Sequence, residues 1–251
     1  MESAAPVFLV GGGWDERAHA LTYGPFASAA GRAGRARVAC VLHDIPERDV
    51  AYGFAAAALR RAGVDDTFPV FVSQDHPLRF GDLNGATGVL VGGGLTPAYH
   101  DAIAPTSGEW LPWLRDNAIP YAGFSAGAMI APEFGIIGGW KIRRGDQDLQ
   151  ICSEDVSEDE EYLDIRPGLG LVPFAVDVHA AQYGTPTRLM HAVHARFVTD
   201  GWAIDEDTML EIAGGTVRVH GLGSAYCVQP GSDGLEVTIV SGGETPALGK
   251  A

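Results

Sequence analysis

The stretch from Ile119 to Pro132, IPYAGFSAGAMIAP, decides the fold class and the chemistry of this chain. A strand-like run, Ile119 to Ala122, leads into the pentapeptide Gly123-Phe124-Ser125-Ala126-Gly127, and a helix-like run, Ala128 to Pro132, follows. A strand that turns directly into a helix holds one residue on a strained turn, where small neighbours let its side chain project above the sheet edge. The pattern predicts a nucleophile elbow with Ser125 as the nucleophile. The N–H of Ala126, at the start of the helix, is then an oxyanion donor.

The pentapeptide alone is weak evidence, because glycine accounts for 34 of the 251 residues. The surrounding pattern supports it: short β-branched runs alternate with Ala-rich runs, which is typical of a parallel sheet with helices on both faces. The predicted strands are 7–10, 37–42, 68–72, 88–91 and 119–122, and the predicted helices are 26–33, 48–61 and 110–117.

Beyond about residue 195 the runs become shorter and are separated by Gly-rich turns, which favours antiparallel strands. These strands are predicted at 202–204, 209–212, 216–219, 225–228 and 235–240, and they either extend the main sheet or form a small second one. The fold class is therefore α/β, with three layers around a mostly parallel sheet and an antiparallel C-terminal extension. No repeat or linker divides the chain, so we expect one domain over residues 1–251.

The composition limits which classes of partner and which cellular compartment we expect for this protein. The formal net charge of −15 opposes nucleic acid and anionic membrane surfaces as partners. No basic segment precedes the apolar run near Met1, and no stretch is long enough to span a bilayer, so we expect a cytoplasmic protein. Cys40, Cys152 and Cys227 are widely spaced, which favours buried reduced thiols over disulfides or a zinc site.

Much of the negative charge lies between Glu154 and Glu161, in the run EDVSEDEE. Such a run is more often a solvated loop than a binding site, although a lid beside the elbow is the alternative.

Two strands end in the same letters, at Gly11-Gly12-Gly13 and Gly92-Gly93-Gly94. Neither completes a nucleotide-binding motif, which disfavours nucleotides as ligands. Tight turns account for the first, whereas the second is our choice for a further oxyanion donor.

A serine nucleophile needs a base, normally histidine, and the base needs a carboxylate that orients it. Among eight histidines, His179 closes an apolar strand-like run, the place where catalytic groups gather in α/β sheets. His191 and His194 have the spacing of a metal pair, but a solvated helix face accounts for them better. The carboxylate comes from Asp205-Glu206-Asp207, and periodicity does not choose among the three.

Four motifs in this order resemble the peptidase E (aspartyl dipeptidase) and cyanophycinase family. They are Gly92-Gly93-Gly94, Gly123-Phe124-Ser125-Ala126-Gly127-Ala128, the Gly168-Leu169-Gly170-Leu171 turn before Asp177-Val178-His179, and Ala203-Ile204-Asp205-Glu206. The resemblance runs from Val7 to about Val228. It implies a fold like that of the class-I glutamine amidotransferases. It also implies nucleophile Ser125, base His179, orienting carboxylate Glu206 and oxyanion donors Gly94 and Ala126.

The chain departs from that family where the substrate is recognised. Leu95, followed by Thr96, stands where aspartyl-specific members have a polar amide residue. An Arg-rich stretch is replaced by a segment that contains Gln182 and Tyr183, with Arg188 as the one remaining arginine. A buried substrate carboxylate without a guanidinium partner is costly, so we expect a specificity other than Asp-Xaa. Leu95, Thr96, Gln182, Tyr183 and Arg188 are the predicted substrate-binding residues.

These observations predict a serine peptidase that acts on short peptides through an acyl-enzyme, as an exopeptidase or dipeptidase, with no metal and no organic cofactor. Two alternatives stay open: an esterase or amidase with the same triad, and a catalytically silent amidotransferase-like binding module. The expected partner is a short peptide substrate, and a homodimer is an oligomeric state that the sequence leaves open.

Overall fold

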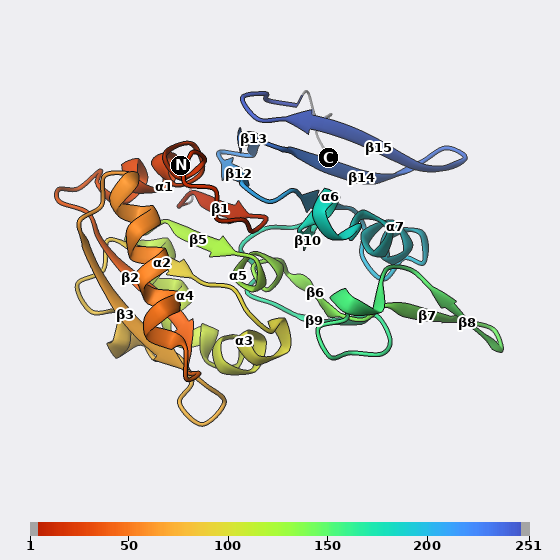
Figure 1. Cartoon of the computed structure of the whole chain (residues 1–251), viewed down its shortest axis with the longest axis horizontal. Helices are drawn as coiled ribbons and strands as arrows, with labels where there is room; N and C mark the ends of the chain where they lie inside the picture. Colours follow the sequence, from red (N-terminus) through yellow and green to blue (C-terminus); the bar gives the residue numbers. More distant parts are fainter. Residues whose placement is uncertain (1–4, 247–251) are drawn as a thin grey trace.

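The computed structural model describes residues 5–246, which form a seven-stranded central sheet with helices on both faces (Figure 1). The strand order is β13-β12-β1-β5-β4-β2-β3, in which the five strands from β1 to β3 are parallel and β12 is antiparallel to both of its neighbours. The strands are β1 (Val7–Val10), β2 (Arg37–His43), β3 (Asp66–Val72), β4 (Gly88–Val91), β5 (Tyr121–Phe124), β12 (Thr208–Ala213) and β13 (Thr216–Gly221).

Strand β1 shows how the sheet separates two cores. Its four residues are all buried and alternate in direction, as the pleat requires. Phe8 and Val10 pack in the core under α1 (His19–Ala30) and α2 (Arg48–Arg61). Val7 and Leu9 belong to the larger core, which also contains residues of α3 (Thr96–Ile103), α4 (Ser107–Asp116) and α5 (Ala126–Met129). The predicted α/β class, with helices on both faces of a mostly parallel sheet, is confirmed.

A second sheet lies beside the first and has the order β10-β11-β14-β15. Its strands are β10 (Ala175–Val178), β11 (Gly201–Ile204), β14 (Ser224–Gly231) and β15 (Gly234–Ser241), with α6 (Ala180–Tyr183) and α7 (Pro186–His194) between the first two. The C-terminal strands therefore adopt both of the arrangements that the sequence left open. Strands β12 and β13 extend the main sheet, whereas β14 and β15 build the second one.

Two antiparallel strand pairs that were not predicted lie in the second half of the chain. They are β6 (Phe134–Gly138) with β9 (Asp164–Pro167), and β7 (Lys141–Arg144) with β8 (Gln147–Gln150). Short 3-10 helices complete the chain: η1 (Phe80–Leu83), η2 (Ala104–Thr106) and η3 (Glu154–Val156).

Predicted boundaries differ most around the elbow. Strand β5 begins two residues later than predicted and continues to Phe124, and the helix after it ends at Met129 instead of Pro132. Helix α1 begins at His19, seven residues before the predicted start, although it contains Pro25. Tertiary packing overrides local propensity here, because residues such as Tyr23 and Phe26 are buried against the sheet.

The three cysteines are free and buried, and burial raises the pKa of the Cys40 thiol to about 12 and that of Cys227 to about 11. No helix among residues 5–246 has both the length and the apolar character needed to cross a membrane. The expectation that no basic segment precedes the first apolar run concerns residues that begin at Met1. Of these, residues 1–4 lie outside the described residues.

Candidate active site

Ser125 occupies a strained turn between β5 and α5. Its backbone dihedrals are φ 51° and ψ −110°, a combination that residues with a side chain rarely adopt. Both flanking glycines are needed, because a Cβ on Gly123 would lie 2.4 Å from the carbonyl oxygen of Gly127, and one on Gly127 would lie 2.4 Å from that of Val91. The pentapeptide thus forms the sharp strand-to-helix turn that its pattern predicted.

His179 and Glu206 complete a chain of hydrogen bonds that starts at Ser125. The Oγ of Ser125 lies 2.9 Å from Nε2 of His179, and Nδ1 of His179 lies 2.8 Å from Oε1 of Glu206. His179 directly follows β10 and has φ 53°, a second left-handed residue in the site. The imidazole side chain is one-fifth exposed and lines the cavity.

The structure distinguishes the three neighbouring carboxylates. Asp205 is buried and accepts from the backbone N–H groups of Ala181 and Ser224, at 2.8 and 3.0 Å. Asp207 accepts from the N–H of Asp15 at 3.0 Å, and burial raises the pKa of its carboxyl group. Glu206 is the one that contacts His179, which is the arrangement that the resemblance implied and that periodicity left undecided.

The end of β1 holds these pieces together, a role that the sequence analysis missed. The carbonyl of Val10 accepts from the N–H of Ser125, that of Gly11 from His179, and that of Gly12 from Asp207, at 2.9, 2.9 and 2.8 Å. Gly12 also lies flat against the imidazole, since an added Cβ would lie 2.2 Å from Cε1 of His179. Gly11-Gly12-Gly13 therefore does more than form a tight turn. The one signal of this role in the sequence was the likeness of this triplet to Gly92-Gly93-Gly94.

The two predicted oxyanion donors flank the nucleophile. Gly94 lines the cavity beside Ser125 and has φ +153°, a conformation that favours glycine. Ala126 follows Ser125 as the first residue of α5. Among residues 5–246, neither backbone N–H donates a hydrogen bond to a protein acceptor. Helix α5 has only four residues, so its dipole adds little, and any anion stabilisation rests on the N–H groups themselves.

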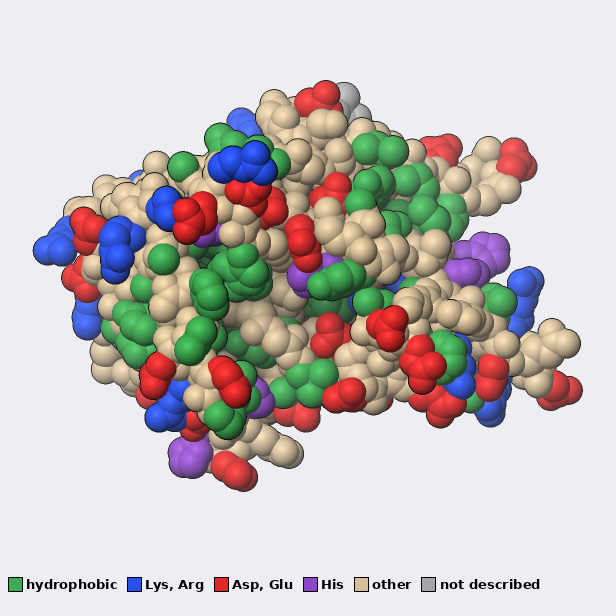
Figure 2. Space-filling view, viewed as in Figure 1, with side chains coloured by type: hydrophobic (Ala, Val, Ile, Leu, Met, Phe, Trp, Pro, Cys, Tyr) green, Lys and Arg blue, Asp and Glu red, His purple; other side chains and the backbone are tan. Residues whose placement is uncertain are grey.

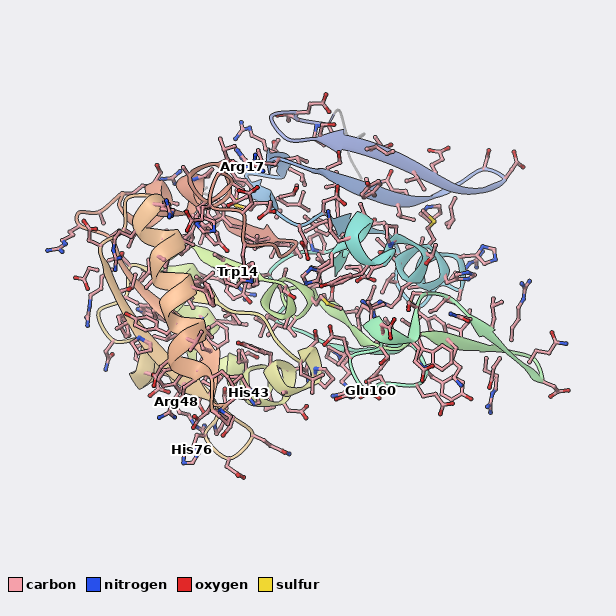
Figure 3. The ribbon with its side chains drawn as sticks, in the orientation of Figure 1. Trp14, Arg17, His43, Arg48, His76 and Glu160 are labelled. Carbon is pink, nitrogen blue, oxygen red and sulfur yellow. The ribbon has the colours of Figure 1, made fainter. Side chains whose placement is uncertain are left out.

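A cavity of about 480 Å³ opens in front of Ser125 and His179. Trp14 and Phe124 form an aromatic wall on one side, with ring centroids 4.5 Å apart. Figure 2 shows hydrophobic side chains on one side of this hollow and Asp and Glu side chains on the other, with Lys and Arg mainly at the edges of the face. Figure 3 places Trp14 on the α2 side of the site and Glu160 on the opposite side, in the loop before β9.

The predicted substrate-binding residues divide into two groups. Leu95, Tyr183 and Arg188 line the cavity, and the ring of Tyr183 lies 4.9 Å from that of His179. Thr96 is instead fully buried, with its hydroxyl 3.6 Å from Sδ of Met129. Gln182 lies behind the triad, where its side-chain oxygen accepts from the N–H of Glu206 at 2.9 Å. Thr96 and Gln182 are therefore not brought together with the other three residues in the cavity lining.

Arg188 is not free to meet a substrate carboxylate. It is 1% exposed and donates through Nε and Nη2 to both oxygens of Asp177, which is fully buried, at 2.8 and 2.7 Å. Its Nη1 donates to the carbonyl of Val156 at 2.7 Å. Burial alone would lower the pKa of Arg188, but the charge and hydrogen bonds of Asp177 outweigh it and raise the pKa. The guanidinium is a structural anchor for the acidic loop.

That loop is exposed at Glu154, Asp155, Asp159 and Glu161, as its charge predicted, but it is also attached to the rest of the chain. Arg188 holds it at Val156, and the N–H of Gly139 donates to the carbonyl of Ser157 at 2.8 Å. Asp155, Ser157, Glu158 and Asp159 all line the cavity. The loop therefore lies beside the elbow, and the alternative of a lid stays a prediction.

His191 and His194 lie in the last turn of α7, as expected for a helix face. Within the described part of the chain, no three His, Cys, Asp or Glu side chains are arranged to hold a metal ion.

No protein-family model and no curated protein matches the sequence. The structure is similar to that of a peptidase from an acI-B1 Actinobacterium, with a TM-score of 0.69 and 16% sequence identity over 98% of both chains. It is also similar to a protein assigned as peptidase E from Listeria monocytogenes EGD-e, with a TM-score of 0.55 and 16% identity, over 88% of this chain and 100% of that one. At such identities the similarity establishes the fold. The chain therefore has a peptidase E-like fold, as its four ordered motifs predicted.

Proposed function

We propose that this protein is a serine peptidase that hydrolyses short peptides through an acyl-enzyme. The observation that supports this most directly is the continuous hydrogen-bond chain from Ser125 through His179 to Glu206, with distances of 2.9 and 2.8 Å. These distances are within hydrogen-bond reach for a nucleophile, its base and an orienting carboxylate. The similarity in fold to two proteins described as peptidases supports the same reaction class.

In the proposed reaction, Oγ of Ser125 attacks the carbonyl carbon of the scissile bond while Nε2 of His179 takes the hydroxyl proton. The oxyanion that forms is stabilised by the N–H groups of Gly94 and Ala126. His179 then gives the proton to the leaving nitrogen, and the C–N bond breaks. Water attacks the acyl carbon of the resulting ester while its proton passes to His179. The bond between the acyl carbon and Oγ then breaks, which releases the carboxylic acid, and the proton returns from His179 to Oγ of Ser125. Glu206 stays ionised and stabilises the imidazolium.

The proposed specificity differs from Asp-Xaa dipeptides. An aspartyl side chain in this cavity would meet Leu95 and Tyr183, and the guanidinium of Arg188 already binds both oxygens of Asp177. Leaving a charge unpaired in a desolvated site costs several kcal/mol. Acidic residues at the acyl side of the scissile bond are therefore disfavoured.

The test is a panel of dipeptides and tripeptides, read by mass spectrometry, beside simple esters and the Ser125→Ala variant. We expect peptide cleavage by the wild-type protein, none by the variant, and labelling of Ser125 by a fluorophosphonate. Ester turnover without peptide turnover would make the protein an esterase. The absence of any turnover or labelling would leave a binding module.

A further inference from the structure

Glu158 places a fixed carboxylate in the cavity that contains Ser125. Its backbone is left-handed, with φ 58°, and so is that of Asp159, with φ 61°. The loop around it is anchored on one side by the bond from Arg188 to the carbonyl of Val156. Glu158 itself accepts, through Oε2, a hydrogen bond of 2.9 Å from the N–H of Thr96 in the first turn of α3. The carboxylate is thus held in place and is not a mobile surface group.

The charges around the cavity are unbalanced. Asp155, Glu158 and Asp159 line it, and the one cation in the lining is Arg188. The charge of Arg188 is already compensated by Asp177, which lies behind it and accepts two of its hydrogen bonds. The cavity therefore has an excess of negative charge that no described side chain neutralises. A cleft lined by one sign of charge attracts ligands of the opposite sign.

The opposite wall offers no charge of its own. Trp14 and Phe124 present aromatic surface there. A ligand that spans the cavity consequently meets apolar surface at one end and a carboxylate at the other. A peptide with one protonated nitrogen near its scissile bond matches this distribution, whereas an acidic peptide does not.

We propose that Glu158 binds a protonated nitrogen of the substrate and so selects peptides with a cationic group next to the scissile bond. The inference rests on the proposed peptidase function, since it concerns the same cavity. The nitrogen is either the free α-ammonium of the N-terminal residue or the side-chain cation of a Lys or Arg residue. Both groups offer the same chemistry to the carboxylate: a positive charge with N–H donors.

A purely structural role for Glu158 makes a different prediction. A carboxylate at a helix N-terminus satisfies a free N–H group and interacts favourably with the helix dipole, and its loss destabilises the fold. However, burial raises the pKa of Glu158, although the Thr96 bond and the charge of Arg188 oppose this shift. The ionised form is thus disfavoured in the folded protein until a cation lies beside it. Glu158→Gln keeps an acceptor for the N–H of Thr96 and removes only the charge.

The experiment measures dipeptide binding by calorimetry in the full-length Ser125→Ala background, where no substrate is consumed. The probes are Arg-Ala, Ala-Ala, N-acetyl-Arg-Ala and the uncharged N-acetyl-Ala-Ala amide. We expect Glu158→Gln to weaken binding of the cationic probes about tenfold or more, as for a lost hydrogen bond to a charged group, and to spare the uncharged probe. Glu154→Gln is the matched control, because it removes an equal charge from an exposed residue of the same loop outside the cavity lining.

The outcomes separate the possibilities. Weaker binding of Ala-Ala identifies the α-ammonium as the bound group, and weaker binding of N-acetyl-Arg-Ala identifies the side chain. Equal weakening by Glu154→Gln, equal weakening of the uncharged probe, or no effect on any probe overturns the inference. A lower Tm in Glu158→Gln with unchanged probe binding assigns the residue to helix capping and also overturns it. If the wild-type protein hydrolyses none of the peptides while the binding pattern holds, the peptidase proposal fails and the cation site stands.

Discussion

Ser125 and His179 donate their backbone N–H groups to consecutive carbonyls at the end of β1, those of its last residue Val10 and of Gly11, which follows it, both at 2.9 Å. Their side chains then meet at 2.9 Å between Oγ and Nε2, although 54 residues separate them in the chain. Both residues have positive φ, and this backbone strain is maintained by the surrounding sheet. The carboxyl end of β1 thereby fixes the proposed nucleophile and the proposed base relative to each other.

The carboxylate that orients His179 is tested by two matched changes. Glu206→Gln should lower kcat by about 10³-fold or more, because an amide does not stabilise the imidazolium as a carboxylate does. Asp207→Asn, next to it, should leave kcat within a few fold, since Asp207 does not contact His179 and an asparagine oxygen can still accept from the N–H of Asp15. Steady-state kinetics on the best peptide of the panel measures both. Comparable losses in the two variants would contradict the assignment.

Gly12 should be necessary for activity, although it has no side chain. In Gly12→Ala the new Cβ would meet the imidazole at 2.2 Å, so the ring of His179 must leave its place and kcat should fall at least about 100-fold. Gly170→Ala is the control, because Gly170 also has positive φ but has open space around the added Cβ. Gly170→Ala should lose about 1 kcal/mol of unfolding free energy through its positive φ alone, and Gly12→Ala should lose more, because the contact with His179 adds to the backbone strain. If Gly12→Ala keeps full activity, the contact with His179 does not position the base.

Arg188 should contribute to stability and not to aspartyl recognition. Arg188→Met leaves Asp177 buried without its partner and should cost about 3–5 kcal/mol of unfolding free energy. Adding Asp177→Asn should recover part of that loss, because the second change removes the unpaired charge. Urea denaturation of the two variants measures the difference. An additive loss in the double variant would mean that the two residues are not energetically coupled.

The order of substrates follows from the cavity lining. Peptides with a neutral residue at the acyl side should exceed Asp-Xaa peptides by at least about tenfold in kcat/KM, because no free cation meets the acidic side chain. Leu95→Asn combined with Tyr183→Arg should shift the preference towards Asp by supplying an amide and a guanidinium. If the wild-type protein cleaves Asp-Xaa or β-aspartyl peptides best, and Arg188→Ala removes that preference, the interpretation of the cavity is wrong.

Glu158 should make the free energy of unfolding fall as pH rises, whereas most carboxylates make it rise. Burial raises its pKa in the folded protein above the value of about 4.3 for an unfolded chain. Glu158 therefore contributes most to stability below that unfolded value, and its contribution is lost as pH rises through the folded pKa. The Tm of Glu158→Gln relative to wild type should increase between pH 4 and pH 7. A constant difference in Tm across this range would show that its ionisation is not linked to folding.

The sequence by itself predicted the five parallel strands, the helices later seen as α1, α2 and α4, and Ser125 as the candidate nucleophile, because these depend on local patterns. Alternating apolar runs marked β1, β2 and β4, and the small residues around Ser125 marked a turn that only glycine neighbours permit. His179 was also found locally, as the residue that closes an apolar strand.

Only the tertiary structure decided which groups meet across the sheet edge. Glu206 was separated from its two acidic neighbours by the direction of its side chain towards His179, and Gly12 became part of the site because the imidazole lies against it. Arg188, predicted to bind substrate, is an internal anchor because its guanidinium binds Asp177. The acidic loop reaches the wall of the cavity because the carbonyl of Val156 accepts a hydrogen bond from Arg188. Each of these contacts joins residues from different strands, helices or loops, and periodicity along one segment carries no information about the side chains that another segment brings to it.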